Sequence, residues 1–204
     1  PLDYLPRARP EDVQAMECAA VAAQFARDDA RVLAAWDAAG VLQGLAVIGP
    51  LAWETGLYGK PMARLRHFMV RDPHTADAVC EAVMAAAREL AEAQGYTYLD
   101  LQVRVDDLTP VNAAVRTGFR LVATHLTLVH DLSRPVPPCP PTPATIELGR
   151  PEDVAELEAM AARCVPPYSR YAVDPKLPRD KTPVVFGQWA ANSVRGYEIG
   201  RASC

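Results

Sequence analysis

A run of prolines divides the sequence and limits how it can fold. Between Arg134 and Pro143, six of ten residues are proline, in the order R-P-V-P-P-C-P-P-T-P. Proline has no backbone N–H and a fixed φ angle, so such a run joins neither a helix nor a sheet and forms a stiff, extended spacer. The sequence therefore predicts one domain over residues 1–132, a linker over 133–143 and a second domain from residue 144.

A short internal repeat lies on either side of this linker. Residues 9–13 read R-P-E-D-V, residues 150–154 read R-P-E-D-V again, and both copies run into an alanine-rich segment. Proline followed by acids is typical of a helix start, because the missing N–H is not needed there and acids suit the positive end of the helix dipole. The repeat favours a duplication in which both domains begin with the same kind of helix.

Hydrophobic periodicity and turn residues predict the order α, β, β, β, α, β, α, β in the first domain. The expected helices are 11–26, 76–94 and 110–116, and the expected strands are 31–36, 43–48, 63–70, 96–105 and 119–132. A tight turn at residues 39–40 joins the first two strands, and Gly95 ends the long helix. This order predicts an α/β fold of the α+β type, with a mixed sheet.

The second domain has fewer predicted elements. They are a strand at 145–148 and helices at 151–163 and 180–194, after which the chain stops. A stretch of about 50 residues with these elements buries too little apolar surface for a complete core, so residues 144–197 are expected to be the truncated start of a second domain. The last residues, 198–204, read E-I-G-R-A-S-C and resemble a translated adapter sequence, so we expect a non-native tail.

Composition excludes several classes of function. The formal net charge is −4, which does not favour nucleic acid or an anionic membrane as a partner. The five cysteines are scattered without a C-x-x-C pair, so no metal site is expected, and reduced thiols favour a cytoplasmic protein. The motifs of serine hydrolases and of phosphate-binding loops are absent from the sequence.

The most specific motif lies at the end of the first domain. Residues 111–120 read V-N-A-A-V-R-T-G-F-R, which resembles the signature after the fifth strand of the GNAT superfamily of acyltransferases. Its glycine can adopt a positive φ angle and end a short helix, and its phenylalanine can start a buried strand. The resemblance places Asn112 near the pantetheine arm of coenzyme A. Taken alone, Gly118 and Phe119 indicate only a helix end and a core aromatic residue.

A second group of motifs is similar to the two-domain dTDP-fucosamine acetyltransferases. Residues 53–59 (W-E-T-G-L-Y-G) resemble the W-D-S-x-F-F-G stretch of that family, from which Glu54, Leu57 and Tyr58 depart. The resemblance implies that Trp53 and Tyr58 line an acceptor-sugar pocket. The alternative is a turn packed by two aromatic residues.

The second domain carries further motifs of the same family. They are S-R-Y at 169–171, D-P at 174–175 and Q-W at 188–189, followed by N-S at 192–193 and G-Y at 196–197. The resemblance makes Arg170 and Tyr171 substrate-binding residues, with the Arg170 guanidinium on a nucleotide diphosphate. The alternative for Arg170 is an ion pair with Asp174.

By the same resemblance, the first domain is degenerate. Active members hold the coenzyme A pyrophosphate with backbone N–H groups of a basic, glycine-rich loop at a helix N-terminus. The matching residues 71–78 contain no glycine, and Asp72 and Asp77 repel a diphosphate while Pro73 lacks a donor. We therefore expect acetyl-CoA and the unidentified catalytic residues to belong to chain beyond Tyr197.

The implied function is N-acetyl transfer from acetyl-CoA to a small-molecule primary amine, and more narrowly to the amine of a nucleotide-linked sugar. The present chain is expected to be an inactive fragment, and a homodimer is an expected assembly. The alternative from another class is a non-catalytic binding or scaffolding module, which the glycine-free loop at 71–78 also predicts.

Overall fold

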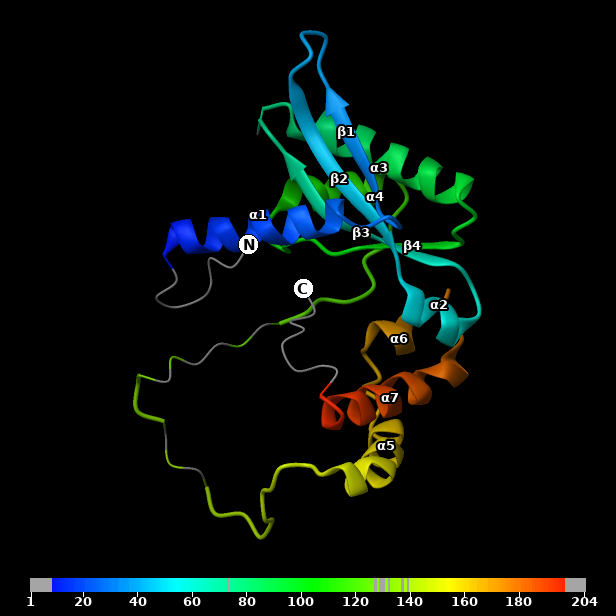
Figure 1. Cartoon of the computed structure of the whole chain (residues 1–204). Coiled ribbons are helices and arrows are strands. Elements are labelled where there is room, and N and C mark those ends of the chain that lie inside the picture. The colour runs from blue at the N-terminus through cyan, green and yellow to red at the C-terminus, as the bar shows by residue number, and fades with distance from the viewer. Residues whose placement is uncertain are drawn as a thin grey trace. The chain divides into compact units, whose positions relative to one another are not determined.

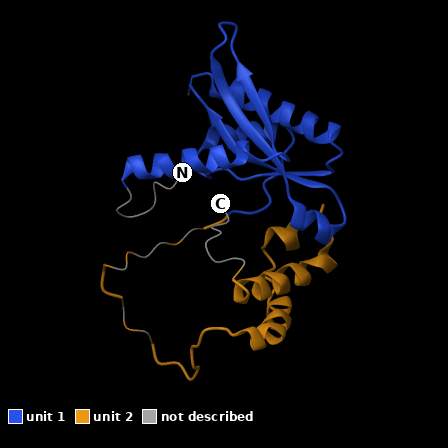
Figure 2. Cartoon of the chain, in the orientation of Figure 1, with its two compact units in different colours: residues 1–3, 7–124 blue, residues 4–6, 125–204 orange. Residues whose placement is uncertain are grey.

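The computed structural model describes residues 9–196 except 73, 127, 129, 130, 132, 137 and 139, so Tyr197 and the expected tail lie outside the described residues. Two compact units make up the chain, and their described parts are residues 9–124 and residues 125–196 (Figure 2). The division between the units precedes the linker predicted at 133–143.

Unit 1 is built on a four-stranded sheet with the order β1-β2-β3-β4 (Figure 1). Strands β1 (Arg31–Trp36), β2 (Leu42–Pro50) and β3 (Met62–Val70) are antiparallel neighbours, whereas β4 (Tyr98–Leu101) runs parallel to β3. The turn between β1 and β2 ends at Gly40, whose φ of +76° suits glycine. The predicted α/β class with a mixed sheet is confirmed.

One long helix, α3 (Ala76–Ala93), contributes as many residues to the buried core of unit 1 as strands β2 and β3 do together. Its buried residues pack on buried residues of β2 and β3. The core residues from α3 are Cys80, Val83, Met84 and Ala87, and those from the strands are Ala46, Ile48, Ala63 and Leu65. A Cβ at Gly44 would lie 2.5 Å from Val79 Cγ1, so this glycine lets the helix approach the sheet closely. The predicted apolar face of the long helix is confirmed.

Three further helices belong to unit 1. Helix α1 (Pro10–Phe25) contains no buried residue, α2 (Ala52–Tyr58) connects β2 to β3, and α4 (Leu108–Arg116) packs on α3. The sequence predicted no helix where α2 lies, and a turn packed by two aromatic residues was the alternative to an acceptor pocket. Two backbone bonds define the helix instead, from Thr55 N–H to Leu51 O at 2.8 Å and from Gly59 N–H to Thr55 O at 2.9 Å.

Three predicted strands are wrong in length or in kind. Strand β4 has four residues, whereas 96–105 was predicted, and the described residues of 119–132 and 145–148 form no strand. Phe119 packs against the core of unit 1, but Leu126 and Leu148 are 86% and 92% exposed, so neither segment buries a continuous apolar face. A segment forms a strand only where its backbone N–H and C=O groups pair with a neighbouring strand. An alternating apolar pattern does not show whether such a neighbouring strand is present.

Unit 2 contains a helical pair. Helices α5 (Val154–Arg163) and α7 (Thr182–Val194) pack on each other, and a 3-10 turn precedes each of them. Both helices were predicted, whereas the short α6 (Arg170–Val173) was not.

The two copies of the sequence repeat start their helices in the same way. The Asp12 N–H donates to Arg9 O at 3.0 Å, and the Asp153 N–H donates to Arg150 O at 2.9 Å. In both copies the arginine is extended and the next residue is the proline that opens the first turn. The first copy continues directly as α-helix from Pro10, whereas the second forms a 3-10 turn over Pro151–Asp153 before α5 begins.

Candidate functional site

The candidate site of unit 1 lies where two parallel strands part. Strands β3 and β4 pair only from Met62 and Tyr98 to Leu65 and Leu101, after which β3 continues alone on that side to Val70. The edge of β3 from residue 66 onward is therefore not paired with β4. Two parallel strands that separate in this way leave backbone donors and acceptors available beside the opening.

A β-bulge lies at the point of separation. The pairing of β2 with β3 shifts between Ala46, which lies opposite Phe68, and Ile48, which lies opposite Leu65. Arg66 and His67 therefore share a single opposing residue on β2. A bulge takes one residue out of the hydrogen-bond ladder and redirects side chains at sheet positions next to binding sites.

A cavity of about 310 Å³ adjoins this opening. The end of β3, the start of α3, and the first turn of α4 with the residue before it line the cavity. Its lining residues are Phe68, Met69, Val70, Ala76, Cys80, Asp107, Thr109 and Pro110. Most of these side chains are apolar, and the polar groups among them are one carboxylate, one hydroxyl and one thiol. A cavity of this kind suits an uncharged chain with few polar atoms.

The thiol in this cavity is unreactive. Burial raises the pKa of the Cys80 thiol to about 11, and the nearby charges of Asp107 and Asp77 act in the same direction. The thiolate is the nucleophilic form of cysteine, so Cys80 at neutral pH is a neutral lining group rather than a nucleophile.

Alkylation checks this assignment. In the folded chain at pH 8, iodoacetamide should modify the exposed Cys18 and Cys164 and leave Cys80 intact, because a pKa of about 11 leaves roughly one thiol in a thousand ionised. Peptide mass spectrometry gives the extent of reaction at each position. All three should react in denaturant, and a Cys80 that reacts as fast as Cys18 in the folded chain would contradict the assignment.

The loop ahead of α3 carries acids where a phosphate-binding loop carries glycine. The Asp72 carboxylate accepts the His74 N–H at 2.9 Å, and the Thr75 N–H donates to Asp72 O at 3.2 Å. Asp77 lies in the first turn of α3, 3.5 Å from the Arg116 guanidinium. Pro73 lies outside the described residues. The positive end of the α3 dipole thus faces carboxylates of its own chain.

The residues predicted from the superfamily resemblance are spread over unit 1. Asn112 is exposed on α4, whereas the cavity is lined from α4 by Thr109 and Pro110. Trp53 is half-buried and Tyr58 is buried, both on α2, and neither is among the residues that line the cavity. Their assignment to an acceptor pocket stays a prediction.

Arg170 and Tyr171 lie together in unit 2. The Arg170 guanidinium is 4.5 Å from the Tyr171 ring centroid, and its Nη2 donates to the Tyr171 hydroxyl at 2.6 Å. Tyr171 is buried, its ring meets Trp189 edge-on at 5.3 Å, and its backbone oxygen accepts the Thr182 hydroxyl at 2.7 Å. These contacts give Tyr171 a packing role between α6 and α7, and substrate binding by either residue stays a prediction.

Sequence reasoning missed a group of charged side chains on β3 and β4. The Arg64 guanidinium donates from Nε and Nη2 to the two carboxylate oxygens of Asp100 at 2.6 and 2.7 Å. Both side chains are nearly buried, with 12% and 13% of their surface exposed. The signal was present in the sequence, because Arg64 and Arg66 alternate with the buried Leu65 and so lie on the other face of the strand.

Within the described residues, no group of three or more His, Cys, Asp or Glu side chains is arranged to hold a metal ion. Among the helices that the structure describes, none has the length and apolar character needed to cross a membrane.

No protein-family model and no curated protein matches the chain. Among solved structures it is similar to an aminoglycoside acetyltransferase from an uncultured soil metagenomic sample, with 13% identity over 64% of this chain and 80% of that one and a TM-score of 0.44. A ribosomal-protein-alanine N-acetyltransferase from Brucella melitensis is 16% identical over 60% of this chain and 82% of that one, with a TM-score of 0.43. A transcriptional regulator from Bacillus halodurans is 12% identical over 62% of this chain and 80% of that one, with a TM-score of 0.44. At these identities and TM-scores, the likenesses decide neither a family nor a function.

Proposed function

We propose that the protein is an N-acetyltransferase that transfers an acyl group from acetyl-CoA to a small-molecule primary amine. The observation that carries this proposal is the opening between β3 and β4, with a bulge at residues 66–67 and a mostly apolar cavity beside it. The acyl-carrying arm of coenzyme A is a thin chain with two amide groups. Such a chain can lie along an unpaired strand edge and exchange hydrogen bonds with it, as an added peptide strand does. In this proposal the opening indicates the type of domain to which unit 1 belongs, and it is not the place where the enzyme binds acetyl-CoA.

The residues of unit 1 suit neither the diphosphate of coenzyme A nor the acid–base chemistry of acyl transfer. The stretch at 71–78 presents Asp72 and Asp77, which disfavour a diphosphate. Acyl transfer to an amine also requires a base for the amine proton and an acid for the leaving thiolate. The titratable groups that line the cavity are Asp107 and the neutral thiol of Cys80, which form no such pair.

We therefore assign unit 1 the role of a degenerate acyltransferase domain within the enzyme. In this proposal, acetyl-CoA and the catalytic acid and base belong to chain that follows Tyr197, and the 204-residue chain by itself is inactive. The narrower part of the proposal is the acceptor, the amine of a nucleotide-linked sugar. It rests on the resemblance of residues 53–59 and 169–175 and on no contact within the structure.

The test uses the parent gene, sequenced and expressed across the codons that follow Tyr197. The longer protein should bind acetyl-CoA in isothermal titration calorimetry and acetylate an amine, detected by mass spectrometry of a panel that includes nucleotide-linked amino sugars. The 204-residue chain is the matched control and should show neither binding nor turnover. Failure of the longer protein to bind acetyl-CoA rejects acyl transfer, and tight binding by the control rejects the degenerate role of unit 1.

The second candidate is a non-catalytic binding module. The observation that favours it is the loop ahead of α3, in which acids replace the glycines of an anion-binding loop while the adjoining cavity is retained. A stop codon directly after Cys204 in the parent gene, together with the absence of acetyl-CoA binding, would make this candidate the better one.

A further inference from the structure

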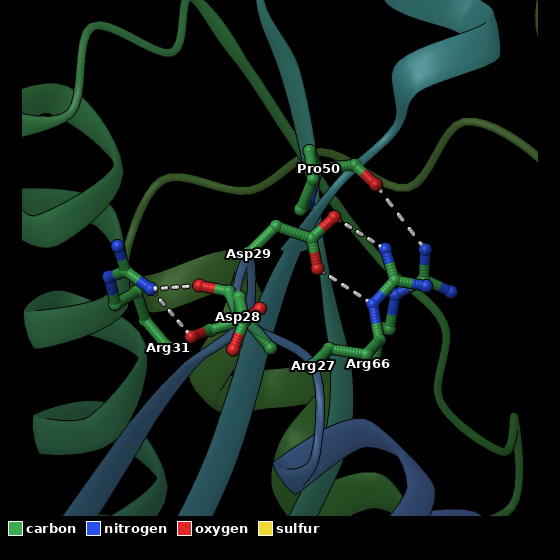
Figure 3. A network of polar contacts seen from close by, with 7 residues as sticks. Arg27, Asp28, Asp29, Arg31, Pro50 and Arg66 are labelled. Atoms are coloured by element: carbon green, nitrogen blue, oxygen red, sulfur yellow. Dashed lines mark hydrogen bonds and ion pairs between the residues drawn. The ribbon is translucent and has the colours of Figure 1, made fainter.

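Arg66 occupies an unusual place on β3. Leu65 belongs to the core under α3, so the alternation of the strand directs Arg66 to the opposite face of the sheet. Its side chain is half-buried, and its Nη2 donates a long hydrogen bond of 3.4 Å to the Pro50 carbonyl oxygen (Figure 3). Its Nε is buried and has no hydrogen-bond partner among the described residues. Most of the hydrogen-bonding capacity of this guanidinium is therefore unused by the described chain.

Two carboxylates near Arg66, those of Asp100 and Asp29, are already held by other arginines, and Glu54 is a further carboxylate whose charge acts on Arg66. Two donors of the Arg64 guanidinium bond the Asp100 carboxylate at 2.6 and 2.7 Å. Two donors of the Arg27 guanidinium bond the Asp29 carboxylate at 2.8 and 2.6 Å (Figure 3). Burial, followed by the positive charges of Arg64 and Arg27, lowers the pKa of the Arg66 guanidinium. Each of these effects opposes a positive charge at Arg66, and a negative partner would offset them.

Gly49 provides the space in which the Arg66 side chain lies. A Cβ at position 49 would stand 3.1 Å from Arg66 Nε and 3.7 Å from its Cδ, so even an alanine there would require the Arg66 side chain to shift by a few tenths of an ångström. The bare backbone of β2 thus forms one wall against the guanidinium. A buried donor without an acceptor destabilises the folded chain, and an apolar side chain of similar length would avoid that loss. The arrangement is explained if a ligand supplies the acceptor.

The ion pair between Arg27 and Asp29 lies next to Arg66, and it can be broken at little cost. Their side chains are 42% and 50% exposed, and an ion pair this exposed adds little stability in water. Both residues come from the connection between α1 and β1 and lie beside Arg66 in Figure 3. Arg27 can therefore exchange Asp29 for another anion without a large loss.

We propose that Arg66 and Arg27 bind an oxyanion, a phosphate or carboxylate group of a small molecule, which displaces Asp29 from Arg27. The planar guanidinium is suited to such groups because two of its N–H donors match two oxygens of a phosphate or carboxylate. The site lies on the face of the sheet opposite α3, away from the cavity that α3 lines. This inference goes beyond acyl transfer and does not rest on it.

The experiment titrates the full chain with inorganic phosphate and, separately, with acetate, at constant ionic strength held with sodium chloride. Proton–nitrogen NMR of arginine Nε–H groups is the readout, and the signal missing from Arg66→Lys identifies Arg66. The Arg66 signal should shift and saturate with one of the two ions. The ion with the higher affinity identifies the group as phosphate or carboxylate.

Four variants make the test specific. Arg66→Met should abolish the saturable response, and Arg66→Lys should weaken it about tenfold because lysine lacks the fork. Asp29→Asn should strengthen binding, since it removes the competing carboxylate, and a gain of affinity cannot come from unfolding. Arg31→Met is the matched control in the same network, because Arg31 is exposed and, among the described residues, donates to the Asp28 and Ala30 carbonyl oxygens. It should bind like the parent chain.

The stability of the ligand-free variant separates this role from a structural one. If the role of Arg66 is to bind a ligand, Arg66→Met should raise the melting temperature of the ligand-free chain, because it removes a buried donor without an acceptor. If Arg66→Met fails to fold, Gly49→Ala replaces it and should weaken binding by displacing the guanidinium. A linear response shared by all arginine signals, or unchanged affinity in both Asp29→Asn and Gly49→Ala, would overturn the proposal.

Discussion

Asp100→Ala is expected to lower the free energy of unfolding of unit 1 by about 3–5 kcal/mol. The variant leaves the Arg64 guanidinium without the carboxylate that receives two of its hydrogen bonds. Arg64 is only 12% exposed in its side chain, so water does not replace the lost partner fully. The remaining positive charge also lies near Arg66, whose pKa already reflects repulsion by Arg64.

Urea unfolding followed by circular dichroism measures this loss. The control replaces both partners, with Arg64→Met and Asp100→Leu in one chain, and should be close to neutral because neither charge is then buried alone. A double-mutant cycle isolates the pair from the other contacts of each residue. A loss below about 1 kcal/mol in Asp100→Ala would show that the pair behaves as an exposed one does.

Gly187→Leu is expected to separate α5 from α7 and unfold unit 2. A Cβ at Gly187 would lie 3.0 Å from Glu158 Cγ and 3.1 Å from the backbone oxygen of Glu158. The backbone of α7 at Gly187 therefore packs closely against α5. A leucine cannot fit without moving α5, and overpacking of this kind costs about 3 kcal/mol. Unit 2 is small, and a loss of that size exceeds what a unit of two packed helices can sustain.

Far-UV circular dichroism and limited proteolysis measure the outcome, with cleavage expected between residues 151 and 196. Gly56→Leu is the matched control, because Gly56 lies inside α2 and a Cβ there meets no atom within 4 Å. That variant should be neutral or stabilising, since glycine is a poor helix former. Protection of α5 and α7 from cleavage in Gly187→Leu would mean that the helices do not depend on this close contact.

The sequence alone determined the elements whose signals are local. The period of apolar residues in 76–94 predicted which face of α3 is buried, and Val83 and Ala87 lie on that face. Gly40 and Gly95 both have a positive φ angle, as a hairpin turn and a helix end require. The repeated proline-acid motif predicted the starts of α1 and of the helical segment from Pro151 to Arg163. In each case, residues close in the chain settle the conformation.

The tertiary structure alone decided the features that depend on partners distant in the chain. The predicted strand at 96–105 ends at Leu101, because only Met62 to Leu65 of β3 pair with it. The place of Arg66 depends on Gly49 across the sheet, and Asp100 meets Arg64 from 36 positions away. Backbone pairing and the burial of charge are set by which segments meet in space. A one-dimensional pattern specifies which residues can be buried or paired, but not which partner reaches them.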